Sequence, residues 1–170
     1  MNILDAKIKI ARKRLLSSEG ARDWNPSGNS MMVIIESEED ELKEAFLMLR
    51  EHLKISEENF FFLLCPRKTS KNDIFATPCF TAADLNWTGN IKNENLKEFF
   101  DKTFDVVVSF AASENKLAAF AVSVAGPGLK VGRESSSQID FDLLIATQPE
   151  EPELFTTELE KYLKILKIEV

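Results

Sequence analysis

The chain has 170 residues, of which 44% are hydrophobic and 29% charged, and it carries a net charge of −7 at pH 7. This length suits a single globular domain, and no apolar run approaches the roughly 18 residues that a membrane-spanning helix needs. The first residues lack the apolar core of a secretory signal, and the overall acidity argues against general nucleic-acid binding. Two cysteines, Cys65 and Cys79, predict reduced thiols in a cytoplasmic protein, with a single bridge left open.

Positive charge is concentrated at the N-terminus. Residues 1–22 hold six basic and two acidic residues, whereas the other 148 residues hold 15 basic and 26 acidic ones. Apolar residues within 2–18 recur at helical spacing, and a stretch with Gly20, Pro26 and Gly28 follows. The sequence therefore predicts a basic amphipathic helix and linker over residues 1–30 and one α/β domain over residues 31–170. The basic residues of the first 22 are Lys7, Lys9, Arg12, Lys13, Arg14 and Arg22.

From residue 31 onward, strand and helix patterns alternate. Strands are expected at 31–36, 59–65, 104–110, 129–132 and 140–146, and helices at 38–53, 93–101, 114–125 and from Pro152. Ser37 and Ser113 are the expected N-caps of two of these helices. Residues 67–92 show no strong period, although a short strand near 77–81 and a turn at 87–89 fit.

This order predicts a three-layer, Rossmann-like α/β sandwich with about five mostly parallel strands. The short connection after Arg133 leaves open that one of the last two strands runs antiparallel at an edge.

Several runs carry a resemblance to a known family. FDVVVSF (104–110), KLAAFAVSVAGPGLKVGR (116–133), FDLLI (141–145) and LNWTG (85–89) before NENLKEFF (93–100) resemble an uncharacterised bacterial family of small cytoplasmic α/β proteins, a domain of unknown function. The resemblance covers most of the chain beyond residue 30 and assigns no functional residue. Residues 104–133 are also similar to the N-terminal Rossmann-like half of heptosyltransferase-like glycosyltransferases. Those enzymes hold their donor largely on a second domain, so this likeness bears on fold more than on activity.

Motifs for catalysis, cofactors and metals are missing from the sequence. No glycine lies between the first or the third strand and the helix that follows it, as a phosphate-binding loop requires, and ESEED follows the first strand. His52, the only histidine, is expected at a helix end in a surface or capping role, and Cys65 is expected as a buried structural thiol. With one histidine and no close cysteine pair, a zinc site is not expected. We therefore expect no catalytic residue, cofactor or metal.

A ligand site is predicted from position alone. Ligands of open α/β sheets bind outside the carboxyl ends of the strands, near the point where strand order reverses. Glu36 and Ser37 belong to this edge, where basic residues beside a helix N-terminus suit a small anionic ligand. The predicted ligand-binding residues are Arg67, Lys68, Ser109, Ser113, Arg133 and Ser135.

Two functions follow from these patterns. The first is a non-catalytic binding or interaction module, dimeric through the N-terminal helix, which uses Lys7, Lys9, Arg12, Lys13 and Arg14. That helix packs either on the acidic body of its own chain, on a second copy, or on an acidic protein partner. The alternative is a small glycosyltransferase-like or nucleotide-sugar-binding domain that uses the loops at the strand ends.

Overall fold

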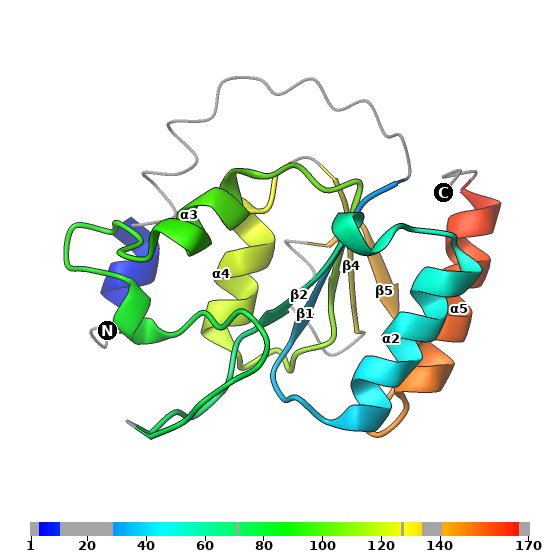
Figure 1. The fold of residues 1–170 in the computed structure, drawn as a ribbon, viewed down its shortest axis with the longest axis horizontal. Helices are drawn as coiled ribbons and strands as arrows, with labels where there is room; N and C mark the ends of the chain where they lie inside the picture. The colour runs from blue at the N-terminus through cyan, green and yellow to red at the C-terminus, as the bar shows by residue number, and fades with distance from the viewer. Residues whose placement is uncertain (1–3, 11–28, 71, 127, 134–140, 167–170) are drawn as a thin grey trace.

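A computed structural model describes residues 4–10, 29–70, 72–126, 128–133 and 141–166 (Figure 1). Five strands form one sheet in the order β2-β1-β3-β4-β5, and every neighbouring pair is parallel. Each strand lies inside or close to its predicted range. The strands are β1 (Met31–Ile35), β2 (Phe60–Leu64), β3 (Val106–Ser109), β4 (Leu129–Arg133) and β5 (Leu143–Ile145).

An antiparallel edge strand, the arrangement left open for the last two strands, is wrong. β5 is parallel to β4, with Val131 opposite Leu143 and Arg133 opposite Ile145. Nine residues separate the end of β4 from the start of β5, and nine residues reach about 30 Å when extended. Because both strands are short, this length is enough to bring the chain back to the amino-terminal edge of the sheet, where a parallel strand must begin. Phe141 at the end of this connection packs into the core on the α4 side of the sheet.

Helices cover both faces of the sheet and bury it, which confirms the three-layer α/β prediction. On one face, α2 (Asp40–His52) and α5 (Pro152–Ile165) run side by side over a core that includes Val33, Val108 and Phe155. On the other face, α3 (Glu94–Asp101) and α4 (Lys116–Val124) cover Ile34 and Val107. All residues of β1 and β3 are buried, as expected for central parallel strands.

The ends of two helices differ from the sequence predictions. α4 begins after Asn115, whose side chain accepts a hydrogen bond from the backbone N–H of Ala118, whereas Ser113 is exposed two residues earlier. Asn and Ser are equally good N-caps, so capping preference alone does not set where α4 begins. The helix begins at the residue directly before the turn that is buried in the core. α2 begins after Glu39, which makes no side-chain cap bond, so Ser37 is not its cap either.

The segment between β2 and α3 has little regular structure. It contains the short 3₁₀ helix η2 (Ala82–Asp84), closed by a capping box from Thr81 and Asp84, and a second 3₁₀ turn, η1 (Glu57–Asn59), precedes β2. Residue Cys79 forms one parallel bridge with Leu64, which is the remnant of the strand predicted near 77–81. The predicted turn at 87–89 is present, with the N–H of Gly89 donating to the carbonyl of Asn86.

The two cysteines are free and face opposite sides of the sheet. Cys65 belongs to the core under α3 and α4, whereas Cys79 packs against the core under α2 and α5. This placement decides against the bridge that the sequence left open, because a disulfide needs side chains that point toward each other.

The N-terminal helix is described over residues 4–10, and it packs on the body of its own chain. Leu4 and Ile8 contact the core on the α3 and α4 side, and the Asp5 carboxylate forms a 2.6 Å ion pair with Lys116. The ammonium of Lys7 lies 5.5 Å from the centre of the Trp87 ring. Residues 1–3 and 11–28, which complete the predicted helix and most of the linker, lie outside the described residues.

Candidate functional site

The topology of the sheet places a switch point between β1 and β3. From β1 the chain moves outward to β2, then returns across β1 to β3 and continues the other way, so the loops after β1 and β3 diverge. A cleft of about 990 Å³ opens at this edge, within the range of small-molecule sites. Its lining residues come mainly from the loops after β1, β2 and β3, and they are Leu4, Glu36, Ser37, Glu38, Glu39, Leu64, Pro66, Arg67, Lys68, Asp73, Phe75, Glu114, Asn115, Lys116 and Leu117.

Asn115 ties the loops of the cleft together. Its side-chain amide donates to the carboxylate of Glu36 at 3.0 Å and to the carbonyl of Cys65 at 2.7 Å, while its oxygen caps α4. The residue is only 6% exposed, so these bonds are shielded from water. One side chain therefore joins the ends of β1 and β2 to the start of α4 and fixes the floor of the cleft.

Glu38 holds one wall of the cleft in place. Its carboxylate accepts the N–H of Thr77 at 2.8 Å and lies 3.4 Å from the ammonium of Lys43, which also donates to the Thr77 hydroxyl. The hydrogen bond with the Thr77 side chain, and then the other bonds from Thr77 and Lys43, lower the pKa of Glu38 below its ordinary value. This network anchors the segment that carries Phe75.

The cleft contains charges of both signs. Arg67 and Lys68, from the end of β2, are exposed and form no ion pair with any described residue. Glu39 and Glu114, from the ends of β1 and β3, are exposed on the same cleft. The third basic residue, Lys116, is already paired with Asp5.

A carboxylate of the protein itself occupies the turn where a phosphate-binding loop would hold its ligand. The N–H of Ala112, between β3 and α4, donates to the Glu36 carboxylate at 3.3 Å. Asn115 donates to the same oxygen of Glu36. The Glu36 carboxylate therefore takes the place at this turn that a bound phosphate would have. This agrees with the absence of a glycine-rich loop in the sequence.

The structure separates the predicted ligand-binding residues. Arg67 and Lys68 line the cleft, and Ser113 is exposed on the turn that borders it. Ser109 is buried at the end of β3, and Arg133 is buried at the end of β4 without lining the cleft. Ser135 and the predicted interaction residues Arg12, Lys13 and Arg14 lie outside the described residues, whereas Lys9 is exposed on the N-terminal helix.

Sequence reasoning missed Asn115 and Glu38, the two residues that shape the cleft. For Asn115 a signal existed, since Asn two residues before the apolar run of α4 is a good N-cap. For Glu38 none existed, because its partner Thr77 is 39 residues away in sequence.

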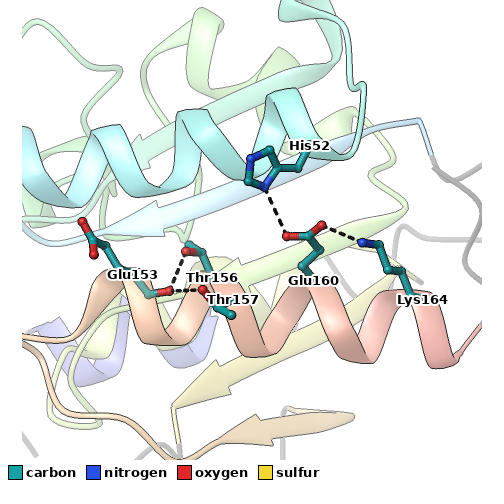
Figure 2. Close-up of polar contacts among 6 residues, drawn as sticks. All are labelled: His52, Glu153, Thr156, Thr157, Glu160 and Lys164. Carbon is teal, nitrogen blue, oxygen red and sulfur yellow. Dashed lines mark hydrogen bonds and ion pairs between the residues drawn. The ribbon is translucent and has the colours of Figure 1, made fainter.

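His52 lies away from the cleft, on the surface between α2 and α5. Its Nδ1 atom lies 3.2 Å from Glu160, whose other carboxylate oxygen lies 2.8 Å from Lys164 (Figure 2). The Lys164 hydrogen bond, and then that of His52, lower the pKa of Glu160. Thr156 and Thr157 in the same view donate to the carbonyl of Glu153 within α5. The histidine thus has the surface role that the sequence predicted, as one member of a chain of polar contacts between two helices.

The described residues contain no group of three or more His, Cys, Asp or Glu side chains that could hold a metal ion. None of the helices in the described ranges is long and apolar enough to cross a membrane.

The fold and the cleft define a doubly wound, all-parallel α/β domain with a charged site at its switch point. The chain belongs to the Family of unknown function (DUF6913), which matches residues 6–166. No curated protein and no solved structure matches the chain.

Proposed function

We propose that this chain is a non-catalytic binding domain that takes a small polar ligand in the switch-point cleft. The supporting observation is the 990 Å³ cleft at the edge of the sheet where open α/β folds bind ligands. Among the residues that line it there is no histidine and no cysteine, so the cleft offers no pair of a nucleophile and a histidine base. Cys65, beneath the floor, is buried, and this burial raises the pKa of its thiol.

The charges of the cleft favour a ligand that carries both a negative and a positive group. Arg67 and Lys68 project from the end of β2, whereas Glu114 follows β3, and β1 lies between these two strands. A zwitterion with separated charges matches this arrangement, because an anionic group meets the basic side and an ammonium meets the acidic side.

The alternative, a glycosyltransferase-like or nucleotide-sugar-binding domain, stays a prediction. Its diphosphate would compete with Glu36 for the N–H of Ala112 and would face several carboxylates, which supports the zwitterion instead. Dimerisation through the N-terminal helix also stays a prediction. Ile10, 44% exposed, is available for such a contact, whereas Leu4 and Ile8 pack on their own chain. A bacterial, cytoplasmic origin rests on the resemblance and the two free thiols.

A thermal-shift panel tests the proposal. The purified chain is screened with amino acids, polyamines, sugar phosphates, nucleotides and nucleotide-sugars. A ligand at a hundred times its Kd adds about 2.7 kcal/mol of stability, which raises the Tm by roughly 5–10 °C. We expect hits among the zwitterions.

A matched pair of variants locates the binding site. Arg67→Ala in the cleft removes the shift, and Lys92→Ala, an exposed basic residue elsewhere on the surface, keeps it. A hit that survives Arg67→Ala and Lys68→Ala together places the ligand elsewhere and contradicts the proposal. Hits confined to nucleotide-sugars support the alternative.

A further inference from the structure

Arg133 is a buried cation with an unpartnered nitrogen. It ends β4, is 2% exposed, and the Nε atom of its guanidinium is buried with no hydrogen-bond partner among the described residues. Its guanidinium lies 5.0 Å from the centre of the Phe110 ring. A buried guanidinium nitrogen that lacks an acceptor costs free energy, since buried polar groups are normally hydrogen-bonded.

A second unsatisfied polar group lies at the same end of the sheet. The Thr147 hydroxyl oxygen is buried and has no hydrogen-bond partner among the described residues. Thr147 follows Ile145 by two residues, and Ile145 is the register partner of Arg133. Two unpartnered polar groups therefore belong to neighbouring strand ends, β4 and β5, at the carboxyl edge where such folds bind ligands.

The N-terminus of α5 reaches this edge directly after Thr147. α5 begins at Pro152, and its N-cap residue, Glu151, gives the helix no side-chain cap bond. The Glu151 carboxylate instead accepts the N–H of Gln148. The first turn of this 14-residue helix, five residues after Thr147, thus brings a positive dipole end to the same edge of the sheet (Figure 1).

Nearby acidic residues limit the charge of a ligand here. Glu36, Glu150 and Glu114 act on Arg133 through space, yet none is within ion-pair distance. Desolvation lowers the pKa of Arg133, and these three carboxylates oppose that effect. They also repel an added anion, and they repel a doubly charged phosphate more strongly than a singly charged carboxylate.

We propose that Arg133 and Thr147 form a binding site for a small carboxylate, separate from the switch-point cleft. The planar fork of the guanidinium matches a carboxylate in bidentate geometry, and the threonine hydroxyl donates a further hydrogen bond. The start of α5 adds its dipole to the same anion. This site satisfies the two polar groups that the protein itself leaves unpaired.

The test is thermal unfolding of the full chain in sodium acetate, at ionic strength held constant with sodium chloride. Wild type shows a saturable rise of the Tm, about 5–10 °C at a hundred times the Kd. Arg133→Met matches the volume of the side chain, keeps or raises the Tm without acetate, and removes the acetate response. Thr147→Val weakens the response at least several-fold in apparent Kd, and Arg133→Lys, which keeps the charge but loses the fork, does the same.

Lys92→Met is the matched control. It removes an exposed basic residue that does not line the cleft, so it leaves the acetate response unchanged. Arg67→Met separates this inference from the proposed function, because a response that it removes comes from the cleft. Three results overturn the inference: no saturable response of the wild type, a response that survives Arg133→Met, or one that Arg67→Met removes. A stronger response to inorganic phosphate than to acetate overturns the carboxylate class. A large drop in Tm for both Arg133→Met and Arg133→Lys without acetate assigns Arg133 a structural role instead.

Discussion

Replacing Asn115 with alanine tests how the cleft is held together. The change removes the N-cap of α4, which costs about 1 kcal/mol. It also removes both bonds donated by the amide and leaves the Cys65 carbonyl and the Glu36 carboxylate without them, which costs a further 1–3 kcal/mol or so. We expect a loss of about 2–4 kcal/mol in the free energy of unfolding, or about 1–2 M in urea midpoint at a slope near 2 kcal/mol/M.

Asn93→Ala is the matched control for this experiment. Asn93 caps α3 in the same way, accepting from Asn95 and Leu96, but it is exposed and donates no comparable bonds. It should cost about 1 kcal/mol, the value of the cap alone. Asn115→Ser, which restores a cap acceptor but not the long-range bonds, should fall between the two. Urea titrations followed by circular dichroism measure all three variants. Equal losses for Asn115→Ala and Asn93→Ala would refute the idea that Asn115 fixes the cleft through Glu36 and Cys65.

Three further predictions concern single sites. Gly128→Ala should lower the free energy of unfolding by more than about 2 kcal/mol, because the added Cβ would lie 2.1 Å from the Phe104 carbonyl oxygen; an unchanged urea midpoint contradicts this. Glu38→Gln should cost about 1 kcal/mol at pH 7. Since the folded protein lowers the pKa of Glu38, its contribution is present above the ordinary carboxyl pKa and is lost as the pH falls below about 4, so wild type and variant should converge in acid. Burial raises the pKa of the Cys79 thiol to about 11, so iodoacetamide at pH 8 should label it roughly a hundredfold more slowly in the folded protein than in urea, as mass spectrometry would show.

The local pattern of the sequence was sufficient for most of the secondary structure. Val106, Val107 and Val108 form a continuous apolar run, which marks a strand buried on both faces and hence a parallel sheet with two helical layers. The proline at the start of α5 and the asparagine before α3 mark helix starts in the same direct way. These signals need only neighbours within one or two turns, so they can be found without tertiary structure.

The sequence by itself determined the α/β class, the approximate limits of the strands and the absence of a glycine-rich phosphate loop. The tertiary structure alone decided the strand order, and with it the location of the cleft between the loops after β1, β2 and β3. It also decided that Asn115 bonds to residues 50 and 79 positions away, and that the Nε atom of Arg133 is buried without a hydrogen-bond partner among the described residues. Periodicity records which face of an element is buried, whereas pairing between distant strands depends on the packing of the whole chain.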